Sequence, residues 1–163
     1  MLRYKKMYRR IFFMDHSSKA AELFLGGCNC AQAVLLAFSD VTGMDRKTAA
    51  MISAPFGGGM GRMREVCGAV SGMFMVLGVL YGYDETVEDD TQKKQAYKDV
   101  QALAEKFRAE CGSIICREIL KNPPSDPNPT PRTAEFYAQR PCARMVMTAA
   151  RLMDEFIAEH PIG

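Results

Sequence analysis

Four of the six cysteines in this chain fall in the first turn of a predicted helix: Cys30, Cys67, Cys116 and Cys142. A helix N-terminus presents unpaired N–H groups and a partial positive charge. That setting stabilises a thiolate and lowers the pKa of the thiol. None of the four cysteines belongs to a CxxC pair. We therefore expect one site, assembled by the fold from four separate segments, whose thiols have lowered pKa values.

Three chemistries could use four converging thiols. A dithiol–disulfide pair exchanges electrons through thiolate attack, and a Cys₄ iron–sulfur cluster needs only thiolate ligands. A structural Cys₄ zinc site ranks third, because zinc sites usually carry the CxxC spacing that is absent here. The competing interpretation is a non-catalytic helical module that binds a partner or small ligand, with the cysteines as buried packing residues.

Further residues are candidates around the four cysteines. Arg62 and Arg64 precede Cys67, and basic residues also adjoin the last two cysteines of the set, which favours thiolates there. Cys28 and Cys111 are extra thiols, which we interpret as possible additional metal ligands or as incidental. The two histidines, His16 and His160, are expected to be solvated near the chain ends, so no Cys–His catalytic arrangement is predicted.

A glycine-rich run, GGGMGRMRE, precedes Cys67. Glycine-rich backbone ahead of a helix can bind an anion, so the run supplies weak anion-binding candidates in Gly57, Gly58, Gly59 and Arg62. The run lacks the GxxxxGK[ST] order and no clear strand precedes it. We therefore favour a tight turn in which larger side chains would clash.

Helical periodicity extends over almost the whole chain, without an alternating strand pattern. Ser17 or Ser18 is predicted to cap a helix that ends at Gly26-Gly27. Asn29 and Gln32 form a capping box for the next helix. Asp45 is predicted to cap a helix over residues 48–53. Residues 55–61 are predicted to have irregular backbone.

The second half of the chain has four predicted features. Residues 66–82 carry no charge and are short for a membrane span of about 20 residues, so they predict a central buried helix. Residues 86–111 predict a long amphipathic helix. Ser113 is expected to cap a short helix with Cys116 at its third position. Residues 121–140, with five prolines, predict an extended loop, and a last helix follows Pro141.

These elements predict an all-α, single-domain helical bundle of about six to seven helices around a central glycine-rich apolar helix. We expect the domain to span residues 16–160 and residues 1–15 to form a basic leader. This leader is either disordered or an upstream extension of a chain whose true start is Met14. Outside that leader the chain is slightly acidic, so no nucleic-acid partner is expected. A chain of this length can bury a core without a disulfide framework, and no secretory segment is recognised. Both observations favour a cytoplasmic location for the protein.

The ordered motifs GCNCAQAVLLAF, FGGGMGRMREVCGAVSG, CGSIICREIL and PCARMVMTAA resemble the redox-active family named for its C_GCAxxG_C_C cysteine pattern. The resemblance runs from about Ala21 to Met153. It implies a small helical domain whose working residues are the four cysteines at helix starts. Cys28 and Cys111 depart from the pattern.

The chain is also similar to the cysteine-bearing helical part of split-Soret cytochromes. That similarity implies an iron–sulfur site and a homodimer, whereas haem is not implied because the haem-binding motifs are missing. The leading hypothesis is an electron-transfer or thiol-redox protein with an unidentified redox partner. We slightly favour a Cys₄ iron–sulfur cluster over a disulfide cycle, because a metal centre would neutralise crowded thiolates.

Overall fold

A central apolar helix, α7, organises the bundle. The computed structural model describes residues 15–163, and within them α7 (Gly68–Tyr81) packs against α3 (Cys30–Ala37) and α11 (Cys142–Glu159). Gly72 lets α7 approach α3 closely, because a Cβ there would stand 2.7 Å from the carbonyl oxygen of Ala31. The predicted all-α architecture with a central glycine-rich helix is thus confirmed.

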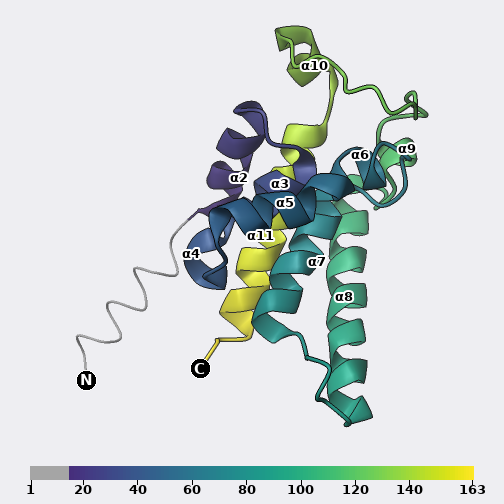
Figure 1. Ribbon diagram of the computed structural model, residues 1–163. Helices are drawn as coiled ribbons and strands as arrows, with labels where there is room; N and C mark the ends of the chain where they lie inside the picture. The colour runs from purple at the N-terminus through teal and green to yellow at the C-terminus, as the bar shows by residue number, and fades with distance from the viewer. Residues whose placement is uncertain (1–14) are drawn as a thin grey trace.

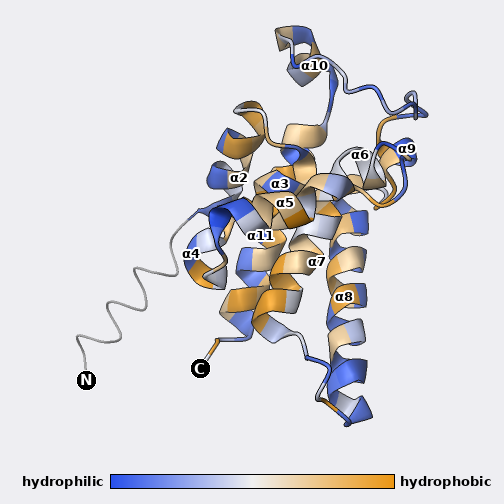
Figure 2. Cartoon of the chain, in the orientation of Figure 1, coloured by the Kyte–Doolittle hydropathy of each residue, from blue (hydrophilic) through white to orange (hydrophobic). Residues whose placement is uncertain are grey.

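The remaining helices surround this core (Figure 1). Helix α2 packs on α3 and α11, and α8 lies along α7 and α11. Figure 2 shows α7 as largely hydrophobic, whereas α8 carries hydrophilic residues along much of its length. Within residues 15–163 seven helices have six or more residues, and besides α3, α7 and α11 these are α2 His16–Leu25, α5 Arg46–Ser53, α8 Asp90–Cys111 and α10 Ala134–Gln139. The shorter helical turns that join them are α4 Ser39–Thr42, η1 Ala54–Phe56, α6 Gly57–Met60 and α9 Cys116–Ile119.

Several predicted boundaries hold. The capping box of Asn29 and Gln32 is formed, Asp45 caps α5, and the left-handed Gly112 ends α8. None of the helices among residues 15–163 has the length and apolar character that a membrane crossing needs. The predicted leader falls almost entirely on residues outside the described ones, so its separation from a domain at 16–160 stays a prediction.

Other predicted boundaries were wrong. Asp15, rather than Ser17 or Ser18, caps α2 by accepting a hydrogen bond from the Ser18 amide at 3.1 Å. Helix α8 begins at Asp90 because Asp89 caps it, so the residues from Thr86 to Asp89 precede the helix.

Two elements near the site also differ from prediction. Cys116 is the first residue of α9 rather than the third, because Ile115 is extended and pairs with Val66 in an isolated antiparallel bridge. The proline-rich segment is not wholly extended, since Thr133 caps the short helix α10.

The prediction that His16 is solvated was wrong as well. Its ring is 5% exposed and stacks on Phe38, with Nδ1 2.5 Å from Asp154 and Nε2 3.0 Å from Asp40. Burial would lower the pKa of His16, but the hydrogen bond and charge of Asp154, together with Asp40, outweigh burial and raise it. His16 therefore acts as a charged link between α2, α4 and α11. His160, by contrast, is exposed.

Candidate functional site

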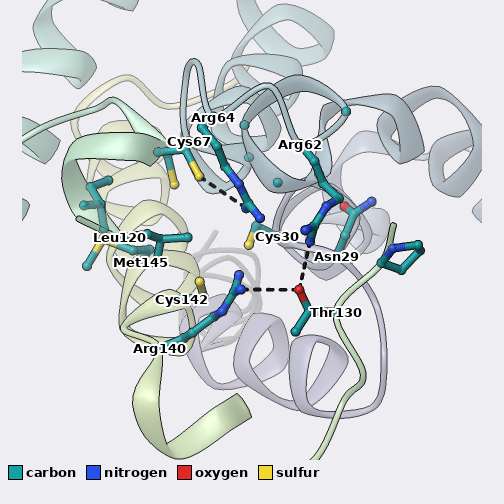
Figure 3. Close-up of a pocket in the computed structure, with 18 of the residues that line it drawn as sticks. Asn29, Cys30, Arg62, Arg64, Cys67, Leu120, Thr130, Arg140, Cys142 and Met145 are labelled. Carbon is teal, nitrogen blue, oxygen red and sulfur yellow. Dashed lines mark hydrogen bonds between the residues drawn. The ribbon is translucent and has the colours of Figure 1, made fainter. Parts of the chain in front are cut away.

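All four predicted cysteines lie at helix starts, as expected. Cys30, Cys116 and Cys142 are the first residues of α3, α9 and α11, and Cys67 immediately precedes α7. The four side chains line one cavity of about 320 Å³. Figure 3 shows the sulfur atoms of Cys30 and Cys142 pointing into a space that the guanidinium groups of Arg64 and Arg140 also enter. The fold has thus brought four distant segments to one place.

Backbone hydrogen bonds hold these helix starts in position. The Cys67 amide donates to the carbonyl of Ile114 at 2.8 Å, and the Cys116 amide donates to the carbonyl of Glu65 at 2.6 Å. These two bonds tie the start of α7 to the start of α9. Asn29 fixes the start of α3, because its side-chain amide also donates to the carbonyl of Ala54 at 3.0 Å.

The glycine-rich segment forms the wall between the helix starts, with a backbone that is irregular as predicted. Five consecutive residues from Gly58 to Arg62 have φ between +61° and +70°, and Arg64 again has φ +61°. Left-handed backbone costs a non-glycine residue roughly 1–2 kcal/mol. At Gly59 a Cβ would also lie 2.6 Å from the Cβ of Cys116. The turn therefore requires its glycines, and it places two strained arginines beside the cysteines.

The pKa values of the four thiols do not share the predicted direction. Burial raises the pKa of Cys67 to about 12. Burial also raises the pKa of Cys116, although Arg64 opposes it. A hydrogen bond with Cys142, and then burial, raise the pKa of Cys30 well above its ordinary value. The expectation of four lowered pKa values was wrong for these three thiols, because burial, preceded at Cys30 by the interaction with Cys142, outweighs the favourable helix ends.

Cys142 is the exception. The hydrogen bond from Cys30 is the largest influence, and it lowers the pKa of Cys142 to about 7, assisted against burial by the charge of Arg140. Cys142 therefore ionises more readily than Cys30, whose pKa the same interaction raises. The arrangement places one activated thiol beside one that holds its proton more tightly.

Four arginines line the cavity: Arg62, Arg64, Arg132 and Arg140. Thr130 accepts hydrogen bonds from Arg62 at 2.9 Å and from Arg140 at 3.4 Å (Figure 3). Arg132 lies over the rings of Phe24 and Phe136, 4.8 Å from each centroid. Arg132 and Thr130 were not among the candidates from sequence, because nothing in a proline-rich loop indicates that it folds back over distant helix starts.

The glycine-rich candidates lie at the cavity, whereas the two extra cysteines do not. Gly57, Gly58, Gly59 and Arg62 all line the cavity, so the weak anion-loop candidates lie next to the cysteines. Cys28 and Cys111 are not among the lining residues. Cys111 ends α8, where burial raises its pKa despite a hydrogen bond with Thr148.

The four thiols meet the needs of a metal site only in part. The donor set suits an iron–sulfur cluster chemically, because the four cysteines supply only thiolates. Among residues 15–163, however, no group of three or more His, Cys, Asp or Glu side chains is placed to hold a metal ion. The six cysteines are free thiols. As arranged, the four sulfurs thus do not form a ready ligand set.

Comparison with known proteins gives one match. The family described as "Putative redox-active protein (C_GCAxxG_C_C)" matches residues 28–156, which is most of the chain and includes all four cysteines of the cavity. No curated protein and no solved structure matches significantly.

Proposed function

Because this chain belongs to the redox-active protein family with the C_GCAxxG_C_C pattern, we propose that it is a thiol-based electron-transfer protein. Its working pair would be Cys30 and Cys142. The observation that carries the proposal is that these two thiols face one cavity from the first residues of α3 and α11, where their interaction lowers the pKa of Cys142 to about 7 and raises that of Cys30. A nucleophilic thiol works best when its pKa is near the ambient pH.

The proposed reaction is reduction of a disulfide substrate. The Cys142 thiolate attacks one sulfur of the substrate, so that a mixed disulfide forms and the first substrate thiolate leaves. Cys30 then loses its proton to that thiolate or to water and attacks the Cys142 sulfur. The second substrate thiolate leaves and takes up a proton from water. The substrate gains two electrons, and the protein keeps a Cys30–Cys142 disulfide that its redox partner must reduce.

Positive charge near Cys142 supports this assignment. The charges of Arg140, Arg132 and Arg64 each lower the pKa of Cys142. They would also stabilise thiolates that leave from the substrate within the cavity. Cys67 and Cys116 face the same cavity, but their raised pKa values make them weaker nucleophiles than Cys142.

Trapping of the mixed disulfide tests the proposal. Reduced Cys30→Ser protein should accumulate a covalent adduct at Cys142 with a small disulfide, because the resolving thiol is missing. Cys142→Ser protein should form no such adduct at neutral pH, and Cys111→Ala protein should behave as wild type. If the Cys142→Ser protein reduces the disulfide at the wild-type rate, the proposed pair is wrong.

An iron–sulfur cluster bound by all four cysteines is a second candidate function. Its specific support is that the fold directs four thiols, one from each of four segments, to one cavity. When bound, such a cluster would supply one-electron transfer. Protein purified without oxygen would then be coloured and contain iron and sulfide, and each of the four Cys→Ser variants would lose both. Colourless, iron-free protein with titratable thiols would exclude this candidate.

A cytoplasmic location and a homodimer also remain proposals. The homodimer rests on the similarity to split-Soret cytochromes, and the location rests on free thiols in a chain of this size. Sedimentation of the full chain under reducing conditions would test the dimer, which predicts about twice the mass of one chain.

A further inference from the structure

We propose that the cysteine cavity contains a binding site for an oxygen-bearing anion, centred on Arg64. The first observation is the charge of the lining. The side chains that line the cavity include four arginines and no aspartate or glutamate. The carboxylate of Asp126 lies 3.9 Å from the guanidinium group of Arg62, is half exposed and is not among the lining residues. A cavity lined by one sign of charge attracts ligands of the opposite sign.

The second observation is the incomplete hydrogen bonding of Arg64. This side chain is 2% exposed. Its Nε donates to the carbonyl of Pro124 at 2.9 Å, and Nη1 lies 3.9 Å from the Cys116 sulfur. Nη2 is buried and has no hydrogen-bond partner among the described residues. A buried donor of a charged group is costly to leave without a partner, so this atom indicates a ligand that is itself an acceptor.

The third observation is how the chain holds Arg64 there. The left-handed turn from Gly58 to Arg62 precedes it, and Arg64 itself has left-handed backbone with φ +61°. A Cβ on Gly58 would lie 2.8 Å from the Cγ of Arg62 and 3.5 Å from Nη1 of Arg64. Strained backbone of this kind persists at sites where a side chain must be held in one position. Here the strain holds two guanidinium groups at the wall of the cavity.

Guanidinium groups favour one class of ligand. The planar fork of arginine matches carboxylate, phosphate and sulfate oxygens. A free inorganic oxyanion and the charged group of a larger substrate share this chemistry. We assign the site to the second source, namely the anionic group of a small disulfide substrate that reacts at Cys142. This assignment rests on the proposed function, whereas binding of the anion does not.

The binding arm uses inorganic sulfate and phosphate as probes on the reduced full-length protein. At constant ionic strength, replacing chloride by sulfate should slow alkylation of Cys142 by iodoacetamide several-fold and raise the melting temperature. Arg64→Gln should abolish both effects, and the matched control Arg117→Gln, an exposed arginine outside the cavity, should retain them. If neither anion has any effect on wild-type protein, the inference is overturned, and this result does not depend on a variant that folds.

The substrate arm compares two disulfides of similar size, dithiodipropionate with two carboxylates and bis(2-hydroxyethyl) disulfide with none. Wild-type protein should reduce the charged compound at least about tenfold faster, and Arg64→Gln should lose most of that preference. Equal rates with both compounds in wild type would overturn the substrate assignment. Sulfate protection without reduction of either disulfide would keep the anion site and reject the proposed function.

Discussion

Cys30, the first residue of α3, and Cys142, the first residue of α11, face the same cavity, and their interaction moves the pKa values of the two thiols in opposite directions. This interaction separates the properties of two residues that the sequence places in similar surroundings. It makes Cys142 the better nucleophile and keeps Cys30 neutral. The division of roles in the proposed reaction follows from this one relationship.

Alkylation of Cys142 should depend on pH with a midpoint near its pKa of about 7. The rate should rise with pH because the thiolate is the reacting form. Labelling with iodoacetamide followed by peptide mass analysis would follow each cysteine separately. Cys67, whose pKa burial raises to about 12, should stay unlabelled over the same range. A midpoint for Cys142 at the ordinary thiol value of 9.0 would contradict the assignment.

Loss of the donor at position 30 should change that midpoint. Cys30→Ala removes the hydrogen bond that stabilises the Cys142 thiolate, so the midpoint should rise by about one pH unit. Cys30→Ser keeps an O–H donor and should show a smaller rise. The same alkylation experiment measures both variants. An unchanged midpoint in Cys30→Ala would mean that the arginines alone activate Cys142.

Two glycines of α7 should respond oppositely to alanine. A Cβ at Gly72 would meet the Ala31 carbonyl at 2.7 Å and the Val34 Cβ at 2.9 Å, so Gly72→Ala should lower the free energy of unfolding by about 1–3 kcal/mol. A Cβ at Gly78 would meet nothing within 4 Å. Gly78→Ala should therefore raise stability by up to about 1 kcal/mol through helix propensity. Urea denaturation measures both, and equal effects would contradict the close approach of α7 to α3.

His16 should make stability depend on pH. Its pKa is raised in the folded protein from 6.5, so the charged ring stabilises the fold fully below that value. The contribution is lost as pH rises through the raised folded pKa. His16→Gln should cost about 1–3 kcal/mol at low pH and less as the pH increases. Denaturation between about pH 5.5 and about pH 8.5 would show this, with the exposed His160→Gln as control; a constant difference would contradict the charged link.

The sequence predicted the helices and the cysteine positions well, because both depend on local signals. Apolar periodicity and the capping box at Asn29 act within a few residues, and both appear in the structure. The motifs recognised in the sequence also pointed to the four cysteines that line the cavity, whereas Cys28 and Cys111 do not line it.

The electrostatics of the site could not be predicted in the same way. Helix-start placement suggested four lowered pKa values, but burial and the Cys30–Cys142 hydrogen bond depend on contacts between distant segments. The same holds for Arg132 and Thr130, which reach the cavity from a proline-rich loop. It also holds for His16. Its partners, Asp40 and Asp154, are far from it in the sequence, so its burial could not be predicted from local signals.

The pairing of the cysteines after oxidation tests the central claim most directly. Reduced, iron-free protein would be treated with one equivalent of a small disulfide, quenched with acid and mapped by mass spectrometry. We predict a disulfide between Cys30 and Cys142, with Cys67 and Cys116 still reduced. A first disulfide that joins any other pair, or no disulfide at all, would contradict the account.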